Sequence, residues 1–110
     1  MCKWGGVSVA PIVDVFTASN TVAKTWTLPF VPKEVIFYVN PTGGNNLVRF
    51  RYDIENNVRY FQNNTDTETV NHNVDSLITY SNGVLSYTAL TSNYARATSA
   101  IIYNSNFDIQ

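Results

Sequence analysis

The chain has 110 residues, with 7 lysines and arginines against 8 aspartates and glutamates and a formal net charge of −1 at pH 7. Only 14% of the residues are charged, against an average of about 25%, and the clustered Lys and Arg that nucleic-acid binding requires are missing, so we expect no nucleic-acid partner. No apolar run approaches the roughly 20 residues of a membrane-spanning helix, so we expect no membrane insertion.

Residues 1–6 are predicted to form a flexible N-terminal entry to one β-sandwich domain, which covers residues 7–110. Gly5 and Gly6 have no side chains that could anchor this entry. The segment also lacks the apolar region of a secretory signal peptide, so we expect synthesis in a cytoplasm and no signal-peptide secretion. Cys2 is the only cysteine, which excludes a disulfide within the chain.

The first two predicted strands cover Val7–Phe16 and Thr21–Leu28. Pro11 interrupts the first of them and cannot donate to a β-ladder, which confines this point to a sheet edge or a bulge. Asp14 lies between two valines in the same strand. We expect its charged side chain to face solvent.

Two prolines interrupt the densest apolar stretch of the chain, residues 25–39. Because each proline fixes φ and lacks an N–H, Leu28–Pro32 is predicted to be a corner at which the chain changes sheets. Trp26 and Ile36 are expected to anchor the corner on either side. The strand Glu34–Asn40 follows, with the β-branched and aromatic residues typical of a strand covered on both faces.

Residues 40–61 are predicted to form a loop, a strand, a turn and a second strand. Asn40–Asn46 is predicted to be a loop, because all seven residues favour turns. Leu47–Ile54 alternates apolar and polar residues, which is typical of a strand with one face in the core and the other in water. A tight turn at residues 55–57 leads into a strand at residues 58–61. Gln62–Asp75 is polar and fits either a long loop or a twisted edge strand.

An Asn82-Gly83 pair lies between two β-rich runs in Ser76–Thr88. Both residues can adopt the positive φ of a type I′ turn, so the segment is predicted to be a hairpin. A connector with a short helical turn at Thr91–Arg96 and strands at Thr98–Tyr103 and Phe107–Ile109 complete the chain. Strands at this spacing indicate an all-β sandwich or barrel, and we predict a single antiparallel β-sandwich of the jelly-roll type.

Arg49, Arg51 and Arg59 come closest to a basic patch, but Asp53 and Glu55 lie among them. We interpret this arrangement as cross-strand charge pairing on a wet sheet face. The same pairing accounts for the two carboxylates more simply than the acid pair of a glycosidase does.

His72 is the only histidine, so any mechanism that needs an imidazole depends on it. Its spacing from the neighbouring carboxylates Asp66, Glu68 and Asp75 matches no metal motif, and no serine lies in a Gly-x-Ser-x-Gly sequence. We therefore predict no catalytic residue, no metal and no cofactor. A small hydrolase that uses His72 remains an alternative.

Seven tyrosines exceed what the centre of one small core can hold. Tyrosine combines a flat apolar ring with a polar tip, which suits core edges, subunit contacts and sugar stacking alike. Three interpretations stay open: packing at the edge of the core, an oligomer interface and a ligand platform. The candidate ligand or interface residues are Trp4, Tyr52, Tyr60, Tyr80, Tyr87 and Tyr94.

The sequence TWTLPFVPKEVIFYV at residues 25–39 resembles a pattern in small β-sandwich modules of bacteriophage tail-fibre, baseplate and other virion-surface proteins. In these modules a threonine-rich strand leads into a Leu-x-Phe-x-Pro-Lys corner and then a Val/Ile-rich strand. Asn82-Gly83-Val84 resembles the hairpin before their last strands, and Ile101–Tyr103 resembles their closing strand. The polar stretch Gln62–Asp75 departs from the pattern, which has a clearer strand there.

The resemblance implies a non-enzymatic component of a virion, assembled as a homo-oligomer with a trimer favoured. It further implies contacts with other virion proteins or attachment to a host-surface glycan. No functional residue is carried over, because the matched positions are structural in that family. The alternative of a different class is a stand-alone carbohydrate-binding, lectin-like module.

Overall fold

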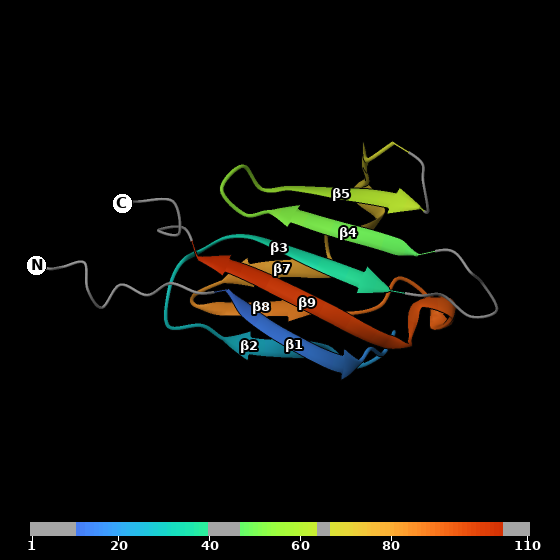
Figure 1. The fold of residues 1–110 in the computed structure, drawn as a ribbon, viewed down its shortest axis with the longest axis horizontal. Helices are drawn as coiled ribbons and strands as arrows, with labels where there is room; N and C mark the ends of the chain where they lie inside the picture. Colours follow the sequence, from blue (N-terminus) through green and yellow to red (C-terminus); the bar gives the residue numbers. More distant parts are fainter. Residues whose placement is uncertain (1–10, 40–46, 64–66, 105–110) are drawn as a thin grey trace, which may run out of the picture.

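The computed structural model describes residues 11–39, 47–63 and 67–104. This part contains nine strands, two short 3₁₀ turns and no α-helix. The strands form two antiparallel sheets that pack face to face, which confirms the all-β sandwich (Figure 1). Trp4, the loop predicted at Asn40–Asn46 and the strand predicted at Phe107–Ile109 lie outside the described residues.

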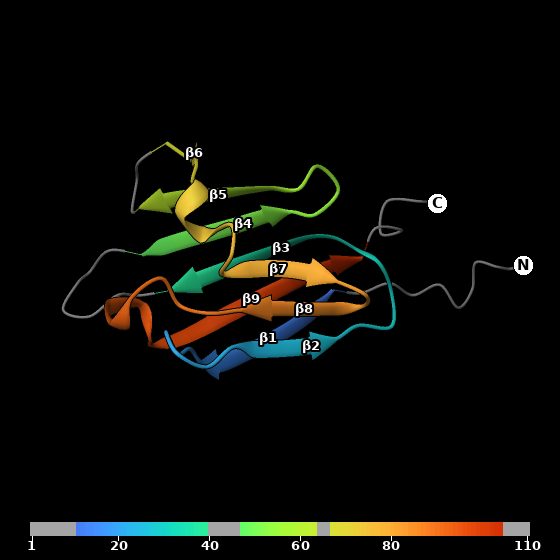
Figure 2. The ribbon, with the colours of Figure 1, turned by 180° about the vertical axis from the view of Figure 1, so that it is seen from behind.

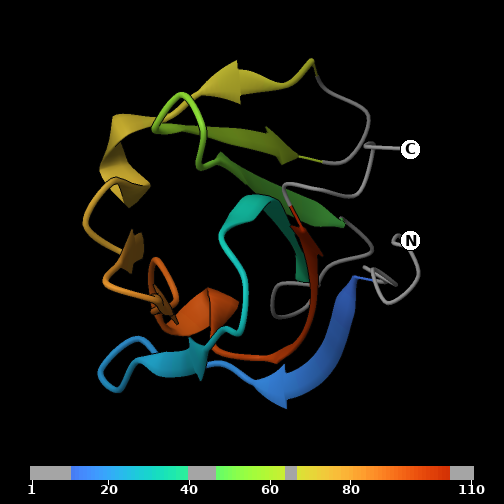
Figure 3. The same cartoon turned by 90° about the vertical axis from the view of Figure 1, so that its left-hand side faces the viewer.

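The two sheets differ in width, as an end-on view shows (Figure 3). Sheet A has six strands, in the order β1 (Ile12–Thr17), β9 (Ala97–Asn104), β3 (Pro32–Val39), β4 (Val48–Asp53), β5 (Val58–Asn63) and β6 (Thr69–Val70). Sheet B, which faces the viewer in Figure 2, has three strands in the order β2 (Lys24–Thr27), β8 (Val84–Tyr87) and β7 (Ile78–Ser81). The 3₁₀ turns η1 (His72–Val74) and η2 (Ser92–Tyr94) precede β7 and β9.

The proline corner is confirmed as the point where the chain changes sheets. Strand β2 belongs to sheet B and β3 to sheet A, so the crossing takes place between Leu28 and Pro32. The backbone N–H of Leu28 donates to the carbonyl of Gly83 at 2.9 Å. This bond ties the start of the corner to the β7–β8 hairpin.

Both predicted hairpins form, and each has residues with positive φ in its turn. Asn57 has φ 55° in the β4–β5 turn, whereas Asn82 and Gly83 have φ 51° and 83° between β7 and β8. The second turn is therefore of the predicted type I′. Strand β4 alternates buried and half-buried residues along its whole length, as its sequence predicted.

The side chains of strand β1 face the opposite way from the prediction, which placed Asp14 toward solvent. Val13 and Val15 are 65% and 67% exposed, whereas Ile12, Asp14 and Phe16 are half-buried on the face toward sheet B. The expectation that Asp14 faces solvent is wrong, because polar partners on β2 compensate its charge at the side of the sandwich.

Lys24 and Trp26 of β2 are these partners. The indole Nε1 of Trp26 donates to Oδ2 of Asp14 at 2.9 Å, and Nζ of Lys24 lies 3.5 Å from the same oxygen. The hydrogen bond from Trp26, with the charge of Lys24, holds the pKa of Asp14 below its ordinary value. Asp14 thus joins the edge strands of the two sheets.

Gln62–Asp75 contains a two-residue edge strand, β6, followed by the turn η1. Val70 is 49% exposed, whereas Val74 is buried. The side chain of Asn71 accepts a hydrogen bond from the N–H of Asn73 at 2.8 Å and so begins the turn. The edge-strand interpretation is confirmed for β6 alone.

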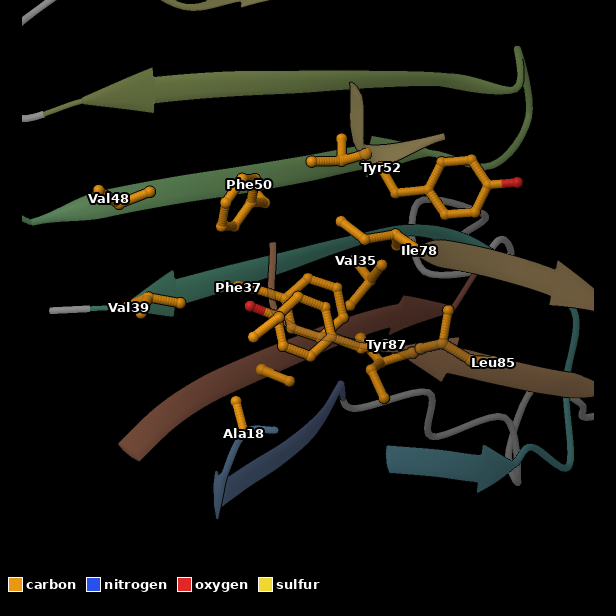
Figure 4. Close-up of a cluster of buried hydrophobic side chains, with 14 of the residues drawn as sticks. Ala18, Val35, Phe37, Val39, Val48, Phe50, Tyr52, Ile78, Leu85 and Tyr87 are labelled. Carbon is orange, nitrogen blue, oxygen red and sulfur yellow. The ribbon is translucent and has the colours of Figure 1, made fainter. Parts of the chain in front are cut away.

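The core lies between the central strands of the two sheets (Figure 4). The rings of Phe37 on β3 and Tyr87 on β8 are stacked, with their centroids 4.2 Å apart and an interplanar angle of 19°. Trp26 lies against Phe37 at 6.0 Å, and Phe50 lies 6.4 Å from Tyr87. Aromatic pairs at these distances add to the stability that their buried area already contributes.

The hydroxyls of two core tyrosines, Tyr52 and Tyr87, differ in their hydrogen bonding, and they point to opposite ends of the sandwich (Figure 4). The hydroxyl of Tyr52 donates to Oδ1 of Asn57 at 2.9 Å. The hydroxyl of Tyr87 is buried and has no hydrogen-bond partner among the described residues. Burial raises the pKa of Tyr87 above its ordinary value, because the ionised form has lost its water.

Tyr87→Phe should raise the free energy of unfolding by about 1 kcal/mol, because it removes a hydroxyl that folding takes out of water without a replacement partner. Tyr52→Phe is the matched control and should lower that free energy by about 1 kcal/mol, because its hydroxyl is hydrogen-bonded. Denaturant unfolding followed by tryptophan fluorescence measures both. A Tyr87→Phe variant that loses as much stability as Tyr52→Phe would contradict the unpartnered hydroxyl.

Candidate functional site

The outer face of sheet A, which points away from sheet B, carries the candidate site. The strand register aligns outward side chains in rows across the sheet. One row contains Val13, Ile101, Ile36, Arg51, Tyr60 and Val70. The next contains Val15, Ser99, Tyr38, Arg49 and Gln62.

These rows divide the face into two parts. We call Val13, Val15, Ile36, Tyr38 and Ile101 the apolar half. We call Arg49, Arg51, Tyr60, Gln62 and Glu68 the charged half. The apolar half lies on β1, β9 and β3, whereas the charged half lies on β4, β5 and the residue directly before β6.

The charged half is organised around the carboxylate of Glu68. Its Oε2 accepts hydrogen bonds from Nη1 of Arg49 at 2.9 Å and from Nε of Arg51 at 3.1 Å. Its Oε1 accepts from Nη2 of Arg51, also at 3.1 Å. Arg51 thereby binds Glu68 through two parallel bonds, the geometry in which guanidinium and carboxylate fit best.

Arg51 makes two further contacts across the sheet. Its Nη1 lies 3.3 Å from Oε1 of Glu34 on β3, and its guanidinium lies 4.2 Å from the ring centre of Tyr60 on β5. The hydrogen bonds with Glu68 raise the pKa of Arg51 and lower the pKa of Glu68. Both groups are therefore held in their charged forms.

Cross-strand charge pairing is confirmed, but the expected partners are wrong. Arg49 and Arg51 pair with Glu68 and Glu34, not with Asp53. Asp53 instead accepts from the backbone N–H and the side chain of Asn56, at 3.2 and 2.8 Å, in the turn that follows β4. Glu68 was not expected as the partner of the arginines, because it comes close to them only when β6 pairs with β5.

Arg59 is not part of this face, which corrects the prediction that grouped it with the other two arginines. It is 8% exposed and lies on the inner side of β5. Its Nε donates to the carbonyl of Ile78 on β7 at 2.8 Å, and its Nη1 donates to Asn57 at 3.0 Å. Its guanidinium also lies 4.1 Å from the ring centre of Tyr52. Arg59 joins the two sheets on the side opposite Asp14.

The structure distributes the candidate tyrosines widely. Tyr52 and Tyr87 are 3% and 2% exposed and belong to the core. Tyr80 and Tyr94 are half-buried and pack against that core. Tyr60 alone among the described candidates lies on the outer face of sheet A, in its charged half.

Tyr38 was not a candidate, yet it lies in the apolar half and is half-buried. In the register it stands between Ser99 of β9 and Arg49 of β4. The alternation of β3 could have indicated this position, because Tyr38 is out of phase with the inward residues Val35 and Phe37.

His72 is exposed, and its hydrogen bond is to Asp75 and not to a residue of the charged half. Its Nδ1 is 3.0 Å from Oδ2 of Asp75, and its side chain is 83% exposed. Within residues 11–39, 47–63 and 67–104, no three His, Cys, Asp or Glu side chains gather closely enough to hold a metal ion. Likewise, the described part of the chain has no helix long and apolar enough to cross a membrane.

Comparison with known proteins returned no match, whether to a family model, a curated protein or a solved structure. The resemblance to virion-surface modules accordingly stays a prediction from the sequence. By contrast, the antiparallel sandwich and the divided outer face are features of the structure itself.

Glu68→Gln should lower the free energy of unfolding by about 1–2 kcal/mol at pH 7, because it removes a carboxylate that accepts three charged hydrogen bonds. The folded pKa of Glu68 lies below the ordinary value of 4.5. The carboxylate's contribution is therefore complete above that pH and is lost as the pH falls through the folded pKa. Urea unfolding of wild type and variant between pH 7 and pH 3 should show the difference shrink.

The control is Glu55→Gln, which removes one carboxylate from an exposed position in the β4–β5 turn. We expect a change within about 0.5 kcal/mol at every pH. Equal effects of the two substitutions would show that Glu68 stabilises the protein only through net charge.

Proposed function

We propose that this chain is a non-enzymatic structural module of a bacteriophage virion, at a tail fibre, a baseplate or the capsid surface. In this role it assembles as a homo-oligomer through the apolar half. The observation that carries the assembly is the exposure of Val13 and Val15, at 65% and 67%. Apolar side chains grouped on one exposed face are typical of protein–protein contact sites.

The surroundings of these valines support a contact surface. Val13 lies beside Ile101, so the apolar area continues from the edge strand toward the middle of the sheet. Ser99, beside Val15, is polar, and Ile36 is only 6% exposed, so neither adds to the exposed apolar area. Tyr38 extends it, and tyrosine is enriched in interfaces. The neighbouring charged half provides a polar rim whose Arg and Glu side chains already neutralise one another.

The virion location is supported by the sequence pattern of the corner, which forms here between the two sheets. A non-enzymatic role is supported by the ion pairs on the outer face. Glu68 and Glu34 are bound to arginines, so these two carboxylates present no acid–base pair to a substrate. Made in the host cytoplasm, such a module would act in the assembled particle.

One observation favours a second function, attachment to a host-surface glycan. The guanidinium of Arg51 lies over the ring of Tyr60, and the amide of Gln62 and the carboxylate of Glu68 belong to the same face. Aromatic rings among polar groups suit sugar stacking. A glycan array that detects binding by wild type, with loss in Tyr60→Ala, would support this function. Absence of binding to every glycan would leave assembly alone.

Wild type should exceed the mass of a single chain at micromolar concentration by analytical ultracentrifugation. Val13→Lys with Val15→Lys should weaken association by more than tenfold, because each substitution removes apolar area worth roughly 1.5–3 kcal/mol when buried. Thermal unfolding of the separated chain should be unchanged within a few degrees, since both side chains already face solvent.

Val22→Lys is the matched control, because Val22 is 68% exposed but lies in the connection between β1 and β2. It should leave the assembly intact. A monomeric wild type, or equal dissociation by Val22→Lys and the double variant, would contradict assembly through the apolar half.

A further inference from the structure

Three of the four sheet edges in the described part of the chain are protected against pairing with another strand. Strand β6 has only two residues, and β2 has four and runs into the proline corner. On β7 the guanidinium of Arg59 occupies the carbonyl of Ile78 at 2.8 Å. Short strands, nearby prolines and covering side chains are the usual means by which proteins block their edges.

Among the described residues, strand β1 has no such protection apart from Pro11, which comes directly before its first residue. It is the longest of the four edge strands, with six residues, and no described strand pairs with its second edge. Its outward side chains, Val13 and Val15, are uncharged. The one charge on β1 belongs to Asp14, which Lys24 compensates at 3.5 Å. Electrostatic repulsion therefore does not oppose the approach of an identical strand.

The backbone groups at this edge can be assigned from the ladder with β9. The N–H of Ala18 donates to the carbonyl of Arg96 at 3.0 Å, one step beyond the register pair Thr17 and Ala97. Because hydrogen-bonded pairs alternate in an antiparallel ladder, the even-numbered residues of β1 bond to β9. Val13, Val15 and Thr17 consequently direct their N–H and C=O groups away from the sheet.

We infer that β1 pairs with the β1 of a second copy, antiparallel and about a two-fold axis, so that sheet A continues from one subunit into the next. The inference rests on the proposed homo-oligomeric function and adds the partner's strand and the contact geometry. It predicts an even number of copies, in place of the trimer expected from the sequence resemblance. A strand that pairs with itself about such an axis presents the same patch from both sides.

The side chains select one register. Centring the axis on Asp14 places that carboxylate opposite its own copy, and like charges in direct opposition destabilise a strand pair. Centring it on Val13 places Val15 opposite the partner's Pro11, which has no N–H to donate. Centring it on Val15 avoids both faults: Val15 meets the partner's Val15, and Val13 meets the partner's Thr17.

The Val15-centred register uses the outward N–H of all three residues and adds apolar area next to the apolar half. On the inner side it sets Asp14 beside the partner's Phe16. Asp14 keeps its bonds to Trp26 and Lys24 there, since these come from its own chain.

Disulfide trapping in a Cys2→Ser background tests the register. In a hydrogen-bonded antiparallel pair the opposed Cα atoms are about 5.5 Å apart, within the roughly 4.4–6.8 Å that a disulfide spans. Val15→Cys should therefore give a covalent dimer on mild oxidation. Val13→Cys, equally exposed, is the control: its copies would be displaced by about 14 Å along the strand and should stay uncrosslinked.

A mixture of Val13→Cys and Thr17→Cys chains should crosslink, although neither variant does so alone. This result cannot arise from random collisions of exposed thiols. Equal crosslinking of Val13→Cys and Val15→Cys, or none by Val15→Cys in a protein that sediments as an oligomer, would overturn the inference while leaving homo-oligomeric assembly in place. A closed trimer would also overturn it, and a monomeric wild type would overturn both.

Discussion

The stacked pair of Phe37 and Tyr87 is the contact on which the sandwich depends. It joins β3, in the interior of sheet A, to β8, the middle strand of sheet B, with the ring centroids 4.2 Å apart. Phe16, Trp26 and Phe50 pack around this pair, so it lies at the centre of the contact between the two sheets. One consequence is that the hydroxyl of Tyr87 is buried without a partner among the described residues, a local cost that the surrounding packing offsets.

Because one sheet has twice as many strands as the other, the sides of the core need separate closure. Polar side chains provide it at both sides. Arg59 reaches from β5 to the carbonyl of Ile78 on β7, and Asp14 on β1 accepts from Trp26 on β2. A half-buried or buried charge is tolerated only when its hydrogen bonds are satisfied. These two links therefore align the sheets as well as close the core.

The outer face of sheet A shows what remains after the core is filled. On β4 the outward positions hold arginines that are neutralised by Glu68 and Glu34, whereas on β1 they hold Val13 and Val15, which no described residue covers. The same strand has an edge with which no strand in the described part of the chain pairs. This combination of a satisfied charged region, an apolar region and an edge that no described strand covers is the basis of the proposed assembly with another subunit.

The sequence by itself determined the features that depend on local chemistry. Alternation in Val48–Asp53 set which side chains face the core, Asn82-Gly83 set the type I′ turn, and the prolines set the corner, since φ, hydrogen-bond donors and period 2 act within a few residues. Only the tertiary structure decided that Asp14 and Arg59 turn inward, that Glu68 joins the arginines, and that Tyr52 and Tyr87 are core residues rather than surface contacts. Each of these depends on which distant strands become neighbours: β2 opposite β1, β7 near β5, and β6 beside β5. Burial of a polar side chain is favourable only when such a neighbour supplies its partner, and no local pattern identifies that neighbour.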